Sequence, residues 1–140
     1  MKTKFYVCPI CGNVITKIID SSVVPECCGQ PMQEMVPNTV DAAAEKHLPV
    51  VTRVDDCTLK VQVGSVPHPM TPEHHICFVY LETAHGGQLH YLDSTCGPDV
   101  EFCGCKDKPI AVYAYCNLHG LWKTEAVPDK AAGKCCCRVK

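Results

Sequence analysis

The spacing of apolar and polar residues along the chain predicts strands rather than helices. Thr58-Leu59-Lys60-Val61-Gln62-Val63 alternates polar and apolar side chains and stops at Gly64, as a half-buried strand does. Further segments rich in β-branched and aromatic residues are expected to be strands at 50–54, 75–81, 88–92, 110–115 and 121–127. Strands at short intervals, separated by Pro and Gly and without a long amphipathic helix, indicate an antiparallel β-sandwich of the immunoglobulin type.

Residues 1–36 follow a different pattern, which is organised around four cysteines. Short strands are expected at 4–7 and 14–19, and Cys8-Pro9-Ile10-Cys11-Gly12 lies between them. A Cys-x-x-Cys turn points backbone amides at sulfur, and Cys27-Cys28 supplies two more thiols, enough for a tetrahedral metal site. A segment this short buries too little apolar surface to fold unaided, so a metal is the expected source of its stability.

The remaining boundaries follow from composition. Residues 37–40 form a linker, and residues 41–46 are expected to form about one helical turn, with Asp41 as a candidate N-cap. We therefore expect a four-cysteine domain at 1–36, a β-sandwich at 37–127, and a cysteine-containing tail at 128–140 that has little apolar surface to bury.

Composition narrows the function further. The net charge is −2 and the basic residues are scattered, which argues against a nucleic-acid partner. The apolar runs are too short to span a bilayer, and the N-terminal residues lack the apolar core of a signal peptide, so the cytoplasm is the expected compartment. In a reducing compartment, 13 cysteines with adjacent pairs, together with 7 histidines, indicate metal binding rather than a disulfide framework.

A second candidate metal site combines cysteine and histidine. Cys116 and His119 follow the 110–115 strand, and their spacing lets one turn present sulfur and nitrogen to a single metal. His47, His68 and His74 lie in short segments that prolines stiffen, where loops carried on a rigid sandwich often hold binding residues.

The histidine pattern leaves alternatives open. Several solvated surface histidines would give a similar sequence, and His85 and His90 look like ordinary surface residues. His74 and His75 are neighbours that point to opposite faces if the strand has already begun, so only one of them can reach a given metal, and spacing does not choose between them.

At these residues the chain resembles desulfoferrodoxin, the two-iron form of superoxide reductase, over roughly residues 1–126. Cys8, Cys11, Cys27 and Cys28 are similar to the desulforedoxin-like domain of that family. The catalytic-domain motifs match at Glu45-Lys46-His47-x-Pro49, His68-Pro69-Met70-x-x-Glu73-His74 and Cys116-Asn117-x-His119-Gly120.

The resemblance implies two irons per chain and one-electron reduction of superoxide to hydrogen peroxide. One iron would be held by the four cysteines, and the catalytic iron by His47, His68, His74, His119 and an axial Cys116; the family pattern selects His74 over His75. It also implies that Lys46 attracts the anion and orients a proton-delivering water, and that Glu45 ligates the oxidised iron. A rubredoxin-like electron donor and a homodimer are further implications.

Eight cysteines depart from the family pattern: Cys57, Cys77, Cys96, Cys103, Cys105, Cys135, Cys136 and Cys137. Cys57 and Cys77 lie in or beside strand patterns and are expected to be small buried residues. Cys103, Cys105 and the terminal Cys135, Cys136 and Cys137 are expected to be exposed thiols, with an additional thiolate site as the alternative. Two other functions are compatible with four sulfurs: a simple electron carrier, which leaves the histidines unexplained, and a zinc-binding structural module.

Overall fold

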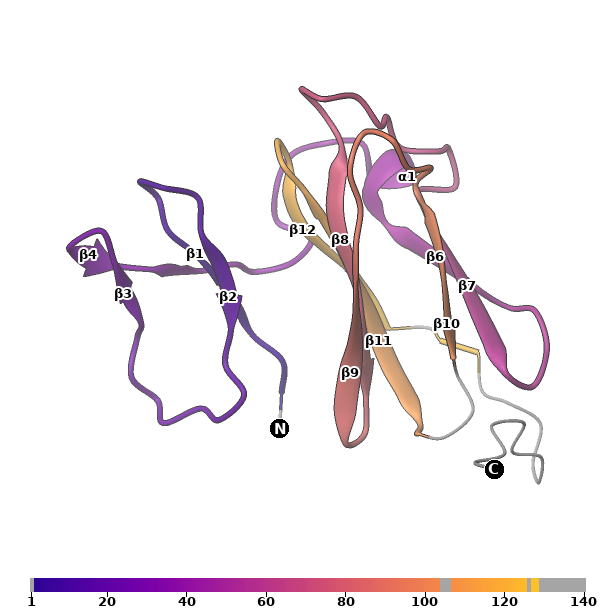
Figure 1. The fold of residues 1–140 in the computed structure, drawn as a ribbon, viewed down its shortest axis with the longest axis horizontal. Helices are drawn as coiled ribbons and strands as arrows, with labels where there is room; N and C mark the ends of the chain where they lie inside the picture. The colour runs from indigo at the N-terminus through magenta and orange to yellow at the C-terminus, as the bar shows by residue number, and fades with distance from the viewer. Residues whose placement is uncertain (1, 104–106, 126, 129–140) are drawn as a thin grey trace. The chain divides into compact units, whose positions relative to one another are not determined.

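The computed structural model describes residues 2–103, 107–125 and 127–128, and the chain divides into two compact units, residues 1–36 and 37–140 (Figure 1). The described residues form thirteen elements, most of them strands. In chain order they are β1 (Phe5–Val7), β2 (Val14–Thr16), β3 (Glu26–Cys27), β4 (Gln30–Pro31), β5 (Gln33–Glu34), α1 (Ala44–His47), β6 (Pro49–Arg53), β7 (Thr58–Val63), β8 (Ile76–Thr83), β9 (Gly86–Tyr91), β10 (Asp99–Cys103), β11 (Pro109–Cys116) and β12 (Gly120–Thr124).

The smaller unit is a three-stranded antiparallel sheet in the order β2-β1-β5, with a separate two-stranded ribbon of β3 and β4. Its apolar core consists of Tyr6, Cys8 and Met32, with Cys27 packed against it. Two of these four residues are cysteines of the predicted metal site. The stability of this unit is therefore expected to depend on a metal bound by those sulfurs, as for other segments this short.

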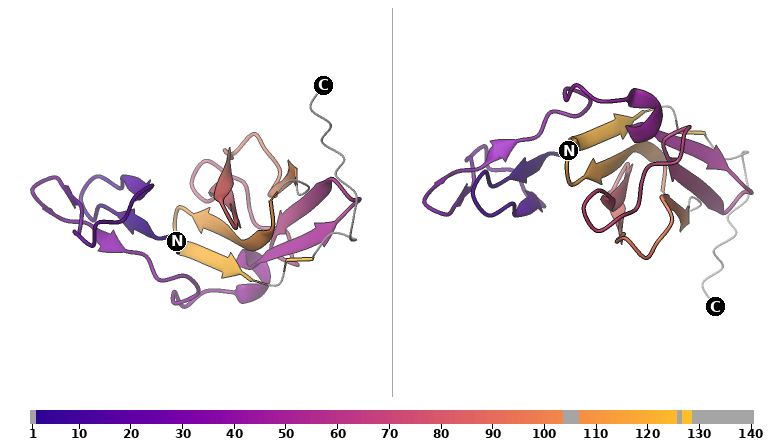
Figure 2. Two further views of the ribbon diagram at one scale, coloured as in Figure 1. Left: turned by 90° about the horizontal axis from the view of Figure 1, so that it is seen from below. Right: turned by 90° about the horizontal axis from the view of Figure 1, so that it is seen from above.

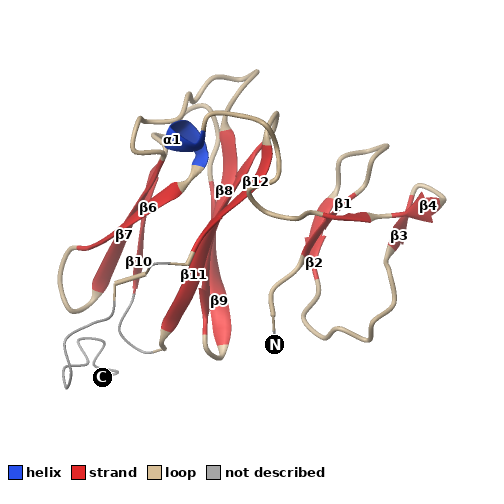
Figure 3. Ribbon diagram, turned by 180° about the vertical axis from the view of Figure 1, so that it is seen from behind, coloured by secondary structure: helices blue, strands red, loops and turns tan. Residues whose placement is uncertain are grey.

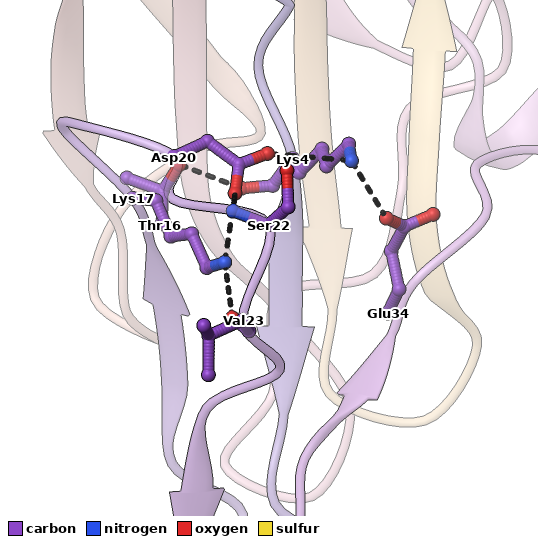
Figure 4. A network of polar contacts seen from close by, with 7 residues as sticks. All are labelled: Lys4, Thr16, Lys17, Asp20, Ser22, Val23 and Glu34. Carbon is purple, nitrogen blue, oxygen red and sulfur yellow. Dashed lines mark hydrogen bonds and ion pairs between the residues drawn. The ribbon is translucent and has the colours of Figure 1, made fainter.

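A polar network ends β2 earlier than the sequence predicts (Figure 4). Lys17 donates to the Asp20 carboxylate at 2.8 Å and also to the Val23 carbonyl, and the Ser22 amide donates to the same carboxylate at 2.8 Å. Lys4 adds an ion pair to Asp20 at 3.4 Å. The Lys17 side chain, followed by the Ser22 amide, holds the pKa of Asp20 down at about 2, so the carboxylate stays charged and the loop stays closed around it.

The closed loop turns apolar residues towards solvent. Ile18 and Ile19 belong to the predicted strand, yet their side chains are 79% and 80% exposed, and Val23 is 67% exposed. The strand predicted at 14–19 is therefore confirmed only as far as Thr16, where β2 ends. The chain then turns so that Lys17 can donate to the Asp20 carboxylate.

The larger unit is an antiparallel β-sandwich, which confirms the predicted fold class (Figures 1 and 3). One sheet has the order β12-β11-β8-β9 and the other β10-β7-β6. The two sheets face each other (Figure 2) and enclose a core that both supply. Its buried members are Leu59, Val61, Val63, Ile76, Val79, Leu81, Leu92, Val100, Phe102, Val112, Ala114 and Cys116.

β7 has the bounds that its alternating sequence predicts, and its buried residues Leu59, Val61 and Val63 all face the core. β10 was not predicted, although Asp99-Val100-Glu101-Phe102-Cys103 alternates in the same way. Val100 and Phe102 are the buried members of that strand, and it pairs with β7 along its whole length. The alternation of this short segment, directly after Pro98, would have been sufficient to predict the strand.

The single helical turn lies at one end of the sandwich strands (Figure 3). It begins later than expected and has Ala43, not Asp41, at its N-cap position, without a side-chain cap. The turn is supported from the β7 side: the Gly64 amide donates to the Leu48 carbonyl at 3.1 Å, and the Val66 amide donates to the Glu45 carbonyl at 2.9 Å. This support fixes the backbone that carries His47.

Gly64 is a point where an added methyl group should disturb that support. Its φ is +84°, and a Cβ there would lie 2.2 Å from the Val66 carbonyl oxygen and 2.7 Å from that of Lys46. Gly64→Ala should lower the free energy of unfolding by about 2 kcal/mol or more, measured by urea denaturation. Gly86→Ala is the matched control, because its nearest neighbour would be 3.9 Å away. Equal effects of the two substitutions would contradict this role of Gly64.

Two cysteine expectations need correction. Cys57 is only partly buried and is disulfide-bonded, and Cys77 is a half-buried free thiol at an irregularity in the β8–β11 pairing. Neither is the fully buried residue that was expected. Cys96 is an exposed free thiol, and Cys103 is exposed, as expected, whereas Cys105 and Cys135–Cys137 lie outside the described residues. No helix in the described part of the chain is long and apolar enough to cross a membrane.

Candidate metal centres

Two groups of side chains in the described residues gather the atoms that bind metals. Cys8, Cys11, Cys27 and Cys28 form the first group, and His47, His74, Cys116 and His119 form the second. Within each group, the candidate ligand atoms all lie within 4.8 Å of one another. The first group lies in the smaller unit and the second in the sandwich.

The sulfur group is shaped by the turn around Cys8. The backbone amides of Ile10 and Cys11 both point at the Cys8 sulfur, at 3.4 Å. The Cys11 and Cys27 sulfurs are 3.6 Å apart. Cys28 adopts a φ of +53°, a conformation that few non-glycine residues take, and this bend brings adjacent cysteines to one centre.

The proton affinities of these sulfurs indicate that a cation belongs among them. The Cys11 amide is the main cause that lowers the pKa of Cys8 to about 6, so this sulfur is readily a thiolate. The pKa of Cys28 is raised to about 12, chiefly through its interaction with Cys11, and that of Cys27 is also raised. Without a metal, Cys27 and Cys28 retain their protons; a bound cation would stabilise the sulfur group as thiolates.

The histidine group lies at the end of the sandwich where several segments meet. His47 ends α1, Cys116 ends β11, and His119 follows in the turn before β12. His68 and His74 come from the segment between β7 and β8, which leads to this same end. The fold thus brings together segments that are more than 70 residues apart in sequence.

The four imidazoles form a ring of near-perpendicular neighbours. The interplanar angles are 71° for His47–His68, 82° for His68–His74, 76° for His74–His119 and 87° for His119–His47. Neighbouring ring centroids are 4.6 to 5.0 Å apart, while His47 and His74 lie across the ring at 6.3 Å. His47, His74 and His119 offer nitrogens to a centre that they share with Cys116, and His68 lies beside them in the ring, outside the group of atoms within 4.8 Å of one another.

Backbone carbonyls fix which nitrogen of the ring faces that centre. His47 Nδ1 lies 2.7 Å from the Ala43 carbonyl, and His68 Nδ1 lies 2.7 Å from the Pro69 carbonyl. A carbonyl only accepts hydrogen bonds, so both Nδ1 atoms carry the proton and both Nε2 atoms present lone pairs. Those two Nε2 atoms are 3.2 Å apart with no proton between them, an arrangement that a bound cation would stabilise.

Burial lowers the pKa of three of the histidines, and one buried nitrogen has no hydrogen-bond partner. Burial is the main cause that lowers the pKa values of His47 and His74, and it lowers that of His68 to about 4. His74 Nε2 is buried and has no hydrogen-bond partner. An orphaned nitrogen in this position fits a metal ion, because a neutral imidazole can offer its lone pair without first losing a proton.

Cys116 supplies the sulfur of this group. Its side chain is fully buried, and its sulfur lies 3.8 Å from His119 Nδ1. Burial raises the pKa of the Cys116 thiol, while the backbone N–H groups of Leu118 and His119 point at the sulfur and oppose that rise. A soft sulfur together with imidazoles suits iron, copper or zinc.

Other sequence candidates lie around the group rather than in it. His75 turns its Nδ1 towards the Thr71 carbonyl at 2.9 Å, so His74 is the member of the pair that joins the group. His85 and His90 are exposed. Glu45 and Lys46 are exposed on α1, and the Lys46 charge contributes to lowering the pKa of His47 and His74, which places the cation near the centre.

Two residues to which the sequence alone gave no role hold the ligand segments. The Asn117 side chain donates to the Glu73 carbonyl at 2.9 Å and accepts from the His75 amide at 2.9 Å, tying the His74 segment to the turn after Cys116. Trp122 contacts His47 and the His119 backbone. Their nearness to the Cys-x-x-His motif was the only signal for either residue.

Comparison with known proteins gives a consistent family. A family model described as Desulfoferrodoxin matches residues 39–125. The desulfoferrodoxin of Syntrophotalea carbinolica is 39% identical over 125 residues, covering 89% of this chain and 97% of that protein. That of Nitratidesulfovibrio vulgaris is 40% identical over 123 residues, covering 88% and 96%.

The solved structures agree with this result. The superoxide reductase from Treponema pallidum has a TM-score of 0.73 and 37% identity, and the match covers 89% of this chain and 99% of that one. The four-cysteine group and the histidine–cysteine group correspond to the two iron centres of desulfoferrodoxin. This chain belongs to the desulfoferrodoxin family.

Proposed function

We propose that this protein is a superoxide reductase that converts superoxide, one electron and two protons into hydrogen peroxide. The ring of four imidazoles beside the buried Cys116 sulfur is the observation that carries the proposal. His47, His68, His74, His119 and Cys116 would hold ferrous iron, which would supply the electron.

Each protein group has a role that follows from its position. The carbonyls of Ala43 and Pro69 hold His47 and His68 with Nε2 facing inward. The Leu118 and His119 amides stabilise negative charge on Cys116 and so tune how strongly the sulfur donates electrons. The exposed Lys46 cation attracts the anionic substrate and can orient a water that delivers protons. Glu45 precedes it on α1 and is the proposed ligand of the oxidised centre.

The product stoichiometry tests the reaction. The reduced protein should form one hydrogen peroxide for each superoxide consumed and release no oxygen, measured after a known amount of potassium superoxide is added in an anaerobic cell. Dismutation would release oxygen as well. Oxygen release in proportion to superoxide consumed, or a protein that contains zinc at both sites, would reject this function.

Lys46→Ala should slow the capture of superoxide. Removing the cation should lower the second-order rate constant by up to about tenfold at low ionic strength, and should flatten its dependence on salt. Lys60→Ala, an exposed lysine on β7, is the control for a change in net charge alone. If both variants show the same rate and salt profile as the wild type, Lys46 has no steering role.

The remaining features of the proposal concern the smaller unit and the setting of the protein. The sulfur group would hold the second iron and receive electrons from a rubredoxin-like donor. A homodimer is proposed because the smaller unit has a core of only a few residues and exposes Ile18, Ile19 and Val23. The cytoplasm is the proposed compartment. Reduction by a purified rubredoxin tests the electron donor, and analytical ultracentrifugation tests the homodimer.

A further inference from the structure

We propose that Trp122 is a positioning residue that fixes two ligands of the histidine centre at once. Trp122 lies on β12 and is only 3% exposed. Its ring stacks on the His47 ring, with centroids 4.9 Å apart and an interplanar angle of 24°. Its indole Nε1–H donates to the His119 carbonyl at 3.1 Å. One side chain thus contacts ligand segments from α1 and from the turn after β11.

The stacking contact fixes a degree of freedom that the Ala43 hydrogen bond leaves open. That bond anchors one atom of the His47 ring, Nδ1, but a single anchored atom still allows the ring to tilt. A flat indole lying nearly parallel to the imidazole restricts the tilt and holds His47 perpendicular to both His68 and His119. Trp122 therefore defines the plane of one ligand.

The hydrogen bond acts on the other side of the centre. The turn of residues 117–119 carries the Leu118 and His119 amides that point at the Cys116 sulfur. Holding the His119 carbonyl restrains this turn, so the Trp122 indole also restrains the donors that tune the sulfur. A residue that only filled the core would not need to stack on the ring of a ligand.

Two substitutions separate these contacts. Trp122→Phe keeps an aromatic ring to stack on His47 and removes the N–H donor, so it should shift the sulfur-to-iron absorption band while iron retention stays near the wild-type value. Trp122→Leu keeps apolar bulk and removes both contacts. It should release iron from the histidine centre to a chelator at least about tenfold faster than the wild type. The four-sulfur centre should be unchanged in both, as an internal reference.

A core variant away from the centre controls for lost stability. Phe102→Leu on β10 shrinks a buried core residue whose ring contact is with His90, which is not a member of the ring of four histidines. If Trp122→Leu loses iron no faster than Phe102→Leu, and Trp122→Phe leaves the band in place, Trp122 is core packing and this inference fails. The inference rests on the proposed histidine centre, not on superoxide chemistry. A wild-type protein without that iron would reject the proposed function itself.

Discussion

Cys116→Ser is expected to abolish the visible absorption of the oxidised histidine centre and to lower superoxide turnover by about two orders of magnitude or more. A thiolate is a strong electron donor to iron and gives the charge-transfer band, whereas a serine hydroxyl is a poor ligand that keeps its proton. The substitution is nearly isosteric at a fully buried position, so the four imidazoles should still hold iron, with reduced affinity. Visible spectroscopy with metal analysis measures both effects.

Cys77→Ser is the matched control for this prediction. Cys77 is a half-buried free thiol on β8, opposite the end of β11 that carries Cys116, but it is not part of the ligand group. The band and the turnover should survive its loss. The spectrum of the four-sulfur centre should be the same in both variants. A band that persists in Cys116→Ser with near-normal turnover would show that another residue completes the centre and would overturn the proposed mechanism.

The geometry leaves few residues for that alternative. His75 is engaged with the Thr71 carbonyl and the Asn117 side chain, both on the surface side of the loop. Cys103 ends β10 and is exposed. Neither residue is buried as Cys116 is. Burial raises the pKa of the Cys116 thiol, and a cation beside the sulfur would stabilise it as a thiolate ligand.

The sandwich could be predicted from the sequence because its strands alternate. β7 is the clearest case, since Leu59, Val61 and Val63 each fall on the buried face. β3, β4 and β5 could not be predicted, because each has only two residues and a strand that short shows no alternation of polar and apolar side chains. The end of β2 was wrong for a different reason: Ile18 and Ile19 fit a strand locally, but the Lys17–Asp20 interaction turns the chain away.

The ligand types could also be predicted, but their atoms could not. Spacing suggests that His47 and His68 can bind a metal, yet the choice of Nε2 depends on two carbonyls whose positions come only from the fold. His119 differs, because its Nδ1 is the nitrogen closest to Cys116 and to His47. Asp41 was predicted wrongly as the N-cap. It is a good capping residue, but it lies two positions before the observed N-cap, Ala43, and so has no helical amide to cap.

Trp122 shows what sequence reasoning misses at a site of this kind. An aromatic residue in an apolar strand is ordinarily core, and nothing in the local pattern says that its ring lies against a ligand. Only the antiparallel pairing of β12 with β11, which places Trp122 opposite Ala114, brings the ring beneath His47. Residues that hold ligands are therefore harder to find than the ligands themselves.

Cys28→Ser should remove the four-sulfur iron and unfold much of residues 1–36, while the sandwich keeps its own metal. Cys28 is exposed, so its substitution removes a ligand with little loss of packing. A structural metal site contributes on the order of 10 kcal/mol of folding free energy. The core of this unit, Tyr6, Cys8 and Met32, is too small to replace that contribution.

The two effects can be measured on one protein. Iron content should fall from two ions to one per chain, and the amides of β1 and β2 should exchange hydrogen much faster, while those of β7 and β11 should not change. Cys96→Ser, which removes another exposed free thiol, should leave both irons in place. Because all five ligands of the histidine centre lie outside residues 1–36, superoxide reduction with a direct chemical donor should survive in Cys28→Ser. Complete loss of that activity with the histidine-bound iron still present would show instead that catalysis requires the four-sulfur centre.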